Sequence, residues 1–213
     1  MTDKPILLII GNSNVGKSAI TKLLLPQPSK YKGKSGKKPG STLLIKQVSQ
    51  SNLPFKIVDL PGFGYMKRSS QRREEHIKRQ IVKHIENHFL NYFLCLVVIN
   101  ILRIEDELNT YLFKNLETIP LSFELLRFLS EFKIPILMVI NKIDKISNKD
   151  KNQIISTFIE SAKQFGIELT DLDDYHPDEI IYKVPYLEFS ALKKTNLGKL
   201  NQFIYAILSQ KTS

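Results

Sequence analysis

The stretch that most constrains the fold of this chain runs from Gly11 to Ser18 and reads GNSNVGKS. An apolar run at 6–10 precedes it and predicts a buried strand, and residues 19–25 predict the opening of a helix. A GxxxxGK[ST] sequence between a strand and a helix is typical of the phosphate-binding loop. A Gly/Asn-rich turn that merely joins strand to helix is the plain alternative, which the complete pattern in this context disfavours.

The residues of this loop have defined expected roles in holding a nucleotide. The glycines let successive backbone N–H groups point at phosphate oxygens, next to the positive end of a helix dipole. Lys17 is expected to reach the β- and γ-phosphates, and the Ser18 hydroxyl to ligate Mg²⁺. We expect nucleotide contacts from Gly11, Asn12, Ser13, Asn14, Val15, Gly16, Lys17, Ser18 and Ala19.

A second segment, Asn141 to Asp144, predicts that the base is guanine. It ends an apolar run at 134–140 and so lies at the carboxyl end of a predicted strand, where open α/β sheets bind ligands. A carboxylate at Asp144 can accept two hydrogen bonds from the paired donors of guanine, which adenine lacks. Asn141 is expected to tie the loops together, and the Lys142 stem to lie over the ring. Alone, an NKxD tetrapeptide could be a charged loop; its placement argues for base recognition.

A third segment, Ser190, Ala191 and Leu192, follows a short predicted strand at 185–189. In guanine-nucleotide proteins this position offers a backbone N–H to the guanine oxygen. The Ser-Ala pair is common and carries little information by itself. Its place where the last base-binding loop should fall supports the assignment.

A fourth segment, Asp59-Leu60-Pro61-Gly62, closes the apolar run 55–58. The Asp59 carboxylate is expected to hold Mg²⁺ through a water, and the Gly62 N–H to meet a γ-phosphate. A loop ordered only by that phosphate acts as a switch. An ordinary Asp-x-Pro-Gly turn is the alternative. A hydroxyl in the Gly-, Ser- and Lys-rich segment before it, at Ser41 or Thr42, would serve as a further Mg²⁺ ligand.

Three of these stretches together, GNSNVGKS, PGST at 39–42 and DLPGFGY at 59–65, resemble the EngB (YihA-type) GTPases. These belong to the TrmE-Era-EngA-EngB-septin-like group of P-loop GTPases. The resemblance spans nearly the whole chain and implies a Ras-like fold, Mg²⁺-dependent GTP binding, slow hydrolysis and a role in large-subunit ribosome assembly. It also favours Thr42 over Ser41 as the ligand of Mg²⁺ beside Ser18 and Asp59, with nucleotide contacts from Gly40, Ser41 and Thr42. The chain departs from the family at Asn100–Arg103, where Asp-x-Arg is usual.

One position bears on the rate of hydrolysis. Phe63 stands where a Ras-type enzyme carries the Gln that orients the attacking water, and a phenyl ring cannot hydrogen-bond to water. Asn14 matches the P-loop Asn that in some related GTPases helps to coordinate K⁺, which would offset developing charge. Capping of the loop by Asn14 is the alternative. The candidate catalytic residues are therefore Lys17, Asn14 and Thr42, with a low intrinsic rate.

Length and hydropathy predict one α/β domain over residues 1–213, since 42% of the residues are hydrophobic. The apolar runs are too short for a spanning helix, no secretory leader is visible, and the single Cys95 excludes a disulfide, so we expect a cytoplasmic monomer. Strand and helix patterns alternate and predict a doubly wound, mostly parallel six-stranded sheet with helices on both faces. Strands are predicted near 5–10, 42–49, 54–59, 93–100, 134–140 and 185–189, and helices near 17–25, 70–88, 104–132 (interrupted at 119–121), 148–165 and 196–209.

The net charge of +10 is concentrated beside the two predicted switch loops, at 30–38 and at 67–83. Basic surfaces attract phosphate backbones without sequence preference. The predicted partners are therefore GTP or GDP and a ribosomal subunit, through its RNA or a protein, with no membrane. The alternative for the basic segments is a solvated charged helix face. The alternatives for the function are a GTP-dependent regulatory switch that acts on a protein, and a nucleotide-binding scaffold that hardly hydrolyses, which Phe63 favours.

Overall fold

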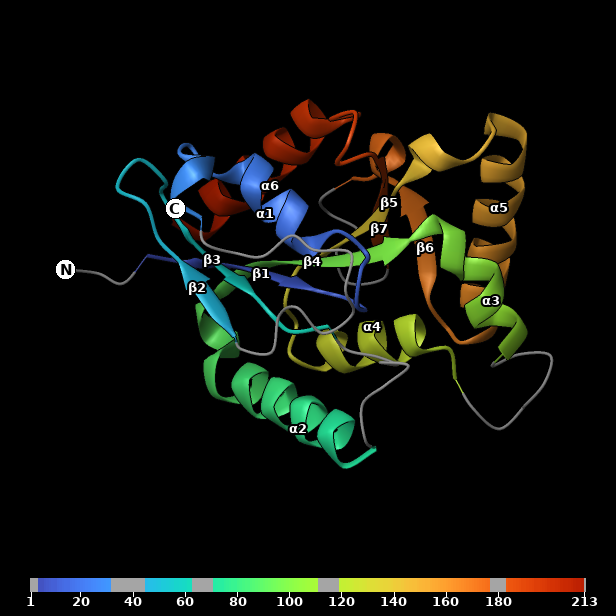
Figure 1. Cartoon of the computed structure of the whole chain (residues 1–213), viewed down its shortest axis with the longest axis horizontal. Coiled ribbons are helices and arrows are strands. Elements are labelled where there is room, and N and C mark those ends of the chain that lie inside the picture. The colour runs from blue at the N-terminus through green and yellow to red at the C-terminus, as the bar shows by residue number, and fades with distance from the viewer. Residues whose placement is uncertain (1–3, 32–44, 63–70, 111–118, 177–182, 213) are drawn as a thin grey trace.

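The computed structural model describes residues 4–31, 45–62, 71–110, 119–176 and 183–212. Its centre is a sheet of seven strands in the order β2-β3-β1-β4-β5-β7-β6 (Figure 1). The strands are β1 (Ile6–Ile10), β2 (Lys46–Val48), β3 (Lys56–Asp59), β4 (Tyr92–Asn100), β5 (Ile136–Asn141), β6 (Glu168–Asp171) and β7 (Lys183–Phe189).

The central strands have continuous apolar sequences because both faces of the sheet are covered. Every residue of β1, β4 and β5 is buried, which is typical of parallel strands between two helical layers. Six strands are mutually parallel, and β2 runs antiparallel to β3 with Gln47 opposite Val58. β2 and β3, which are adjacent in sequence, thus form an antiparallel pair at this edge of the sheet.

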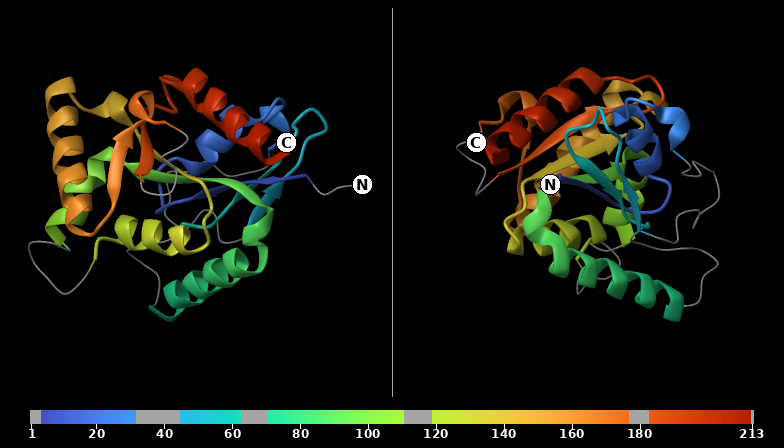
Figure 2. Two further views of the ribbon diagram at one scale, coloured as in Figure 1. Left: turned by 180° about the vertical axis from the view of Figure 1, so that it is seen from behind. Right: turned by 90° about the vertical axis from the view of Figure 1, so that its left-hand side faces the viewer.

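The helices form two layers, as the doubly wound fold predicts. Figure 2 shows α1 and α6 together on one face, and α2, α3, α4 and α5 lie on the other. Two separate apolar clusters correspond to these layers: one includes Ile20 of α1 and Ile204 of α6, the other Ile81 of α2 and Phe158 of α5. The helices are α1 (Lys17–Leu24), α2 (Gln71–His88), α3 (Ile104–Leu108), α4 (Leu121–Glu131), α5 (Asn148–Gln164) and α6 (Leu197–Thr212).

The predicted count of six strands is wrong, because β6 adds a seventh at the sheet edge. Its sequence, ELTD, is short and polar, and only Leu169 is buried. β6 pairs on one side only, in parallel with β7. An edge strand with one buried residue carries almost no alternating apolar signal, so the sequence pattern did not reveal it. Within the described ranges, no helix has the length and apolar character needed to cross a bilayer.

The topology places five loops together along one edge of the sheet, the edge formed by the carboxyl ends of the parallel strands. Because β1, β3, β4, β5 and β7 are parallel, the loops that follow them leave from the same side. The strand order reverses at β1, because β3 lies on one side of β1 and β4 on the other. This is the switch point at which α/β sheets bind ligands.

Candidate nucleotide-binding site

The loop between β1 and α1 has a backbone shape that its glycines permit. Gly11 has φ 149° and Gly16, which precedes α1, has φ 109°. A Cβ on Gly11 would fall 2.1 Å from the Val98 carbonyl oxygen, so no larger residue fits there without displacing β4. Asn14 also takes a positive φ, of 63°, a conformation that asparagine tolerates better than most residues. The loop is thus curled tightly against the sheet.

Lys17 is folded into this loop and is 7% exposed. Its Nζ donates hydrogen bonds to the carbonyl oxygens of Gly11 and Asn12, at 2.9 Å each. Burial lowers the pKa of Lys17 to about 8, and the nearby Asp59 opposes this shift. The ammonium is therefore held at the loop by neutral carbonyls, which a phosphate could outcompete as a partner.

Asp59, the last residue of β3, is fully buried and faces the start of α1. Its Oδ2 accepts hydrogen bonds from the Ser18 hydroxyl at 2.9 Å and from the Tyr31 hydroxyl at 2.8 Å. Its Oδ1 has no hydrogen-bond partner in the part of the chain that the structure describes. Leaving a buried charged acceptor unpaired is costly. Carboxylate and hydroxyl oxygens are the ligands that Mg²⁺ prefers, so Ser18 and Asp59 fit this ion.

The loop after β3 lies directly on the phosphate-binding loop. A Cβ added to Gly62 would be 2.3 Å from Ser13 Oγ and 2.8 Å from Ser13 N. Leu60 is buried, and its N–H donates to the Ile9 carbonyl oxygen at 3.1 Å. Pro61 is buried as well. The structure thus brings the segment from Asp59 to Gly62 beside the loop. Gly40, Ser41, Thr42 and Phe63 lie outside the described residues.

Asn141, at the end of β5, connects two loops. Its Nδ2 donates to the Val15 carbonyl oxygen at 2.7 Å, and its Oδ1 accepts from the Ala191 N–H at 3.0 Å. The side chain is almost completely buried. Next to it Lys142 takes φ 71°, and its Nζ donates to the Asn14 carbonyl oxygen at 2.6 Å. The tie between the loops that the sequence suggested is present in the structure.

Asp144 and Ser190 meet at the far end of the site. The Ser190 hydroxyl donates to Asp144 Oδ1 at 2.6 Å and accepts from the Lys193 N–H at 3.0 Å. The hydrogen bond from Ser190 lowers the pKa of Asp144, which keeps the carboxylate charged. Leu192 is largely exposed and does not join this group. The Ala191 N–H is already engaged by Asn141.

Two side chains at this site were missed from the sequence, Tyr31 and Arg103. Nη1 of Arg103 donates to the Ser13 carbonyl oxygen at 3.4 Å. With the bonds from Lys17 and Lys142, cationic side chains thus occupy the carbonyls of four consecutive residues, Gly11 to Asn14. The arrangement leaves the N–H groups of the loop for an anion. Arg103 lies in the segment where the chain departs from the family pattern, and this departure could have drawn attention to it. For Tyr31 the sequence contains no comparable indication.

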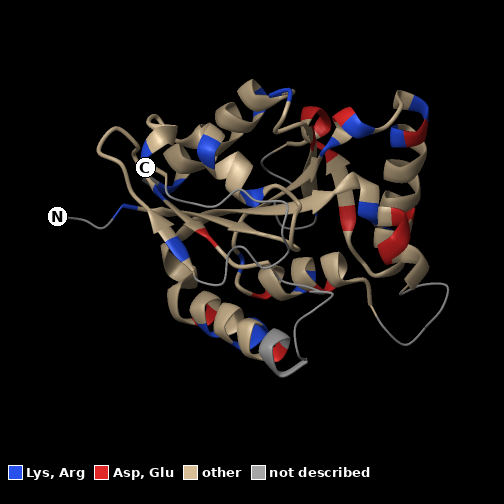
Figure 3. Ribbon diagram, viewed as in Figure 1, with Lys and Arg blue, Asp and Glu red and all other residues tan. Residues whose placement is uncertain are grey.

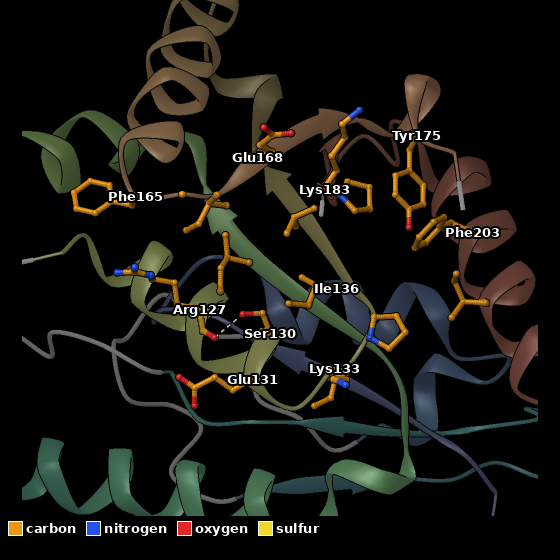
Figure 4. A pocket seen from close by; sticks show the side chains of 18 residues that line it. Arg127, Ser130, Glu131, Lys133, Ile136, Phe165, Glu168, Tyr175, Lys183 and Phe203 are labelled. Carbon is orange, nitrogen blue, oxygen red and sulfur yellow. Dashed lines mark hydrogen bonds between the residues drawn. The ribbon is translucent and has the colours of Figure 1, made fainter. Parts of the chain in front are cut away.

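A separate cavity of about 740 Å³ lies at the amino-terminal ends of the strands, on the opposite side of the sheet from the five loops (Figure 4). It is bordered by α4, α6 and the beginnings of β5, β6 and β7, and it is lined by apolar side chains such as Ile136 and Phe203. Arg127, Glu168 and Lys183 also line it. None of the residues that we expect to bind nucleotide lies among its lining residues, so this cavity is distinct from the site described above.

Comparisons with known proteins agree with the geometry. A sequence model of the family described as "50S ribosome-binding GTPase" matches residues 6–142. A probable GTP-binding protein EngB from Methanococcus aeolicus is 32% identical over 75% of this chain and 66% of that protein. One from Pyrococcus horikoshii is 30% identical over 97% of this chain and 89% of that protein.

A solved structure supports the same assignment over nearly the full length. The crystal structure of a probable GTP-binding protein EngB matches with a TM-score of 0.74 and 27% identity, covering 96% of this chain and 99% of that one. The fold, the loop geometry and these similarities agree. The chain therefore belongs to the family of 50S ribosome-binding GTPases, as an EngB-type GTPase.

Proposed function

We propose that this chain binds GTP and GDP with Mg²⁺ at the five-loop edge of its sheet, hydrolyses GTP slowly, and acts as a nucleotide-dependent switch in assembly of the large ribosomal subunit. Membership of the 50S ribosome-binding GTPase family carries the proposal. We further propose that residues 1–213 form one G domain, which works as a cytoplasmic monomer.

The nucleotide would lie along the loops in a defined direction. Lys17 leaves its two carbonyl partners to contact the β- and γ-phosphates, while the loop N–H groups hold the other phosphate oxygens. At the other end, Asp144 exchanges its hydroxyl partner Ser190 for the paired donors of guanine. Asn141 holds the two loops in place during this exchange, because both of its hydrogen bonds are to backbone atoms of the protein and not to the nucleotide.

The metal would be held where Ser18 meets Asp59, with Thr42 as a third protein ligand in the triphosphate state. Bound Mg²⁺ would neutralise charge on the β- and γ-phosphates during transfer to water. Oδ1 of Asp59, which has no hydrogen-bond partner among the residues that the structure describes, supports this placement. K⁺ beside Asn14 remains a prediction: rates of hydrolysis that coincide in K⁺ and Na⁺ buffers would remove it.

Phe63 at the position of the water-orienting Gln is the reason to expect slow hydrolysis. In this proposal the protein contributes mainly positioning and charge, through Lys17 and the loop N–H groups. Single-turnover hydrolysis measured with and without large ribosomal subunits tests this point. Stimulation by the subunits would show that the partner completes the site.

A basic helix face supports an RNA-containing partner. On α2, Ile77, Ile81 and Ile85 are buried against the sheet, whereas Arg79 and Lys83 are exposed. Figure 3 shows basic and acidic positions along this helix. Arg79 pairs weakly with Glu75, at 3.9 Å between exposed side chains. Such a pair contributes little, so it does not prevent Arg79 from binding a phosphate.

Co-sedimentation with large subunits tests the ribosomal role. We expect association with a non-hydrolysable GTP analogue, weaker association with GDP, and loss at high salt. Replacing both Arg79 and Lys83 by Glu should weaken association while GDP binding is unchanged. The matched control replaces Lys149 and Lys163, two exposed lysines of α5, by Glu. No association in any nucleotide state would contradict the proposal and favour a protein partner elsewhere.

A further inference from the structure

Tyr31 is brought to the candidate metal site by a short turn after α1. The chain leaves α1 at Leu24, forms a 3₁₀ turn at Pro28–Lys30, and the Tyr31 N–H donates to the Pro28 carbonyl oxygen at 3.1 Å. The tyrosine is 7% exposed and belongs to the same apolar cluster as Ile20 of α1. Its ring is therefore fixed by packing, and its hydroxyl is directed to one place.

That place is Oδ2 of Asp59, at 2.8 Å. The same oxygen accepts the Ser18 hydroxyl at 2.9 Å, and both donors come from the α1 side. Two donors on one carboxylate oxygen fix the rotation of the carboxylate. They also leave the other oxygen, Oδ1, without a partner inside the described structure.

We infer that Tyr31 is a positioning residue of the Mg²⁺ site: its hydroxyl anchors Asp59 Oδ2 so that Oδ1 is presented to the ion or to a water bound on it. This inference rests on the proposed function, because it assumes that Ser18 and Asp59 hold Mg²⁺. Tyr31 itself does not ligate the metal. It acts through Asp59 by holding the carboxylate in the orientation that the ion requires.

An opposite arrangement can be distinguished by the sign of one effect. If the Tyr31 hydroxyl occupied the place of the cation, Mg²⁺ would have to displace it, and removing the hydroxyl would strengthen Mg²⁺ binding. The hydrogen bonds favour positioning, since Tyr31 and Ser18 share Oδ2 and neither donor uses Oδ1. Removing the hydroxyl should therefore weaken Mg²⁺ binding.

The test is the release of a fluorescent GDP analogue from wild type and Tyr31→Phe over a series of free Mg²⁺ concentrations. For Tyr31→Phe we expect the Mg²⁺ concentration that half-maximally slows release to rise at least ~10-fold, as expected for the loss of one hydrogen bond to a charged group. In excess EDTA the two proteins should release the nucleotide at the same rate. A midpoint that is unchanged or lower would overturn the inference, and so would faster release in EDTA and in Mg²⁺ alike, which indicates a merely structural role.

Tyr92→Phe is the matched control. Tyr92 is also buried, but it lies at the beginning of β4, away from the loops, and its hydroxyl has no hydrogen-bond partner among the described residues. This variant should keep the wild-type Mg²⁺ midpoint; an equal shift in it would contradict the inference. The response of the wild-type protein distinguishes a failure of the proposed metal site from a failure of the role of Tyr31. If its GDP release does not respond to Mg²⁺, the proposed metal site fails; if it responds and Tyr31→Phe matches it, only the role of Tyr31 fails.

Discussion

The Asn141 carboxamide lies directly against the backbone of Gly16. A Cβ placed on Gly16 would be only 2.2 Å from Asn141 Nδ2, and that same nitrogen donates to the carbonyl of the preceding residue, Val15, at 2.7 Å. The end of β5 therefore supports the phosphate-binding loop from behind. The loop proposed to bind the base and the loop proposed to bind the phosphates are both bonded to this one buried side chain, so we expect a substitution of Asn141 to weaken both contacts.

Asn141→Ala should lower both stability and nucleotide affinity. The change leaves the Val15 carbonyl and the Ala191 N–H without their partner in a buried place, which costs about 3 kcal/mol of unfolding free energy. GDP affinity should fall at least ~10-fold, because the loops lose their common support. Urea denaturation and calorimetric titration measure the two effects. Asn152→Ala, at an exposed position of α5, is the control and should change neither.

The titration of Lys17 predicts a pH dependence of nucleotide binding. Burial lowers the pKa of Lys17 to about 8 in the free protein, and a bound phosphate favours the charged form. GDP affinity should therefore fall as the pH rises above 8, by up to about tenfold per unit. The effect of pH on folding stability is opposite: the pKa of Lys17 in the folded protein lies below its ordinary value of 10.5, so the destabilisation caused by its buried charge is relieved as the pH rises from about 8 to 10.5.

Calorimetry in buffers of different ionisation enthalpy checks this assignment. On GDP binding, Lys17 should take up almost no proton at pH 6.5, where it is already charged, and up to one proton near pH 9. Equal proton uptake at the two pH values would contradict the role of Lys17. In unfolding experiments without nucleotide, the wild-type protein and a Lys17→Met variant should differ most below pH 8, where wild type carries the buried charge.

The strand and loop order was accessible from the sequence because each loop motif follows a strongly apolar strand. β1, β4 and β5 are buried on both faces and gave unambiguous apolar runs. Lys17 lies in the loop motif that follows β1, Asp59 ends the apolar strand β3, and Asn141 ends β5. β6 was missed because an edge strand buries little.

The contacts of Tyr31 and Arg103 could not be inferred, since both depend on how segments distant in sequence meet. Tyr31 reaches Asp59 only through the turn after α1, and Arg103 reaches Ser13 only because β4 lies next to β1. Local patterns carry no information on such pairs. The hydroxyl partner of Asp144, Ser190, is a similar case: each position was chosen as a base contact, and their mutual hydrogen bond emerged from the pairing of β5 with β7.

Asp144→Asn should change the base preference without disturbing phosphate binding. The amide offers a donor where the carboxylate offers only acceptors, so guanine should lose at least ~100-fold in affinity while xanthine, with an oxygen in place of the amine, gains. Competition among GDP, XDP and ADP measures this. The control is Ser190→Ala, which removes the partner of Asp144 but keeps its charge and should preserve the preference for guanine. Undiminished GDP affinity in Asp144→Asn would contradict the assignment.

Gly62→Ala should separate the triphosphate state from the diphosphate state. The added methyl would fall 2.3 Å from Ser13 Oγ and 2.8 Å from Ser13 backbone atoms, so the loop after β3 must move away from the phosphate-binding loop. Since the Gly62 N–H is the group expected to meet the γ-phosphate, affinity for a GTP analogue should drop at least ~10-fold and hydrolysis should slow, with GDP affinity nearly unchanged. Gly198→Ala on α6, where a Cβ meets nothing within 4 Å, is the control and should only add about 0.5–1 kcal/mol of stability. Equal losses for GDP and the GTP analogue in Gly62→Ala would mean that the substitution distorts the phosphate-binding loop itself and that the segment from Asp59 to Gly62 is not a γ-phosphate sensor.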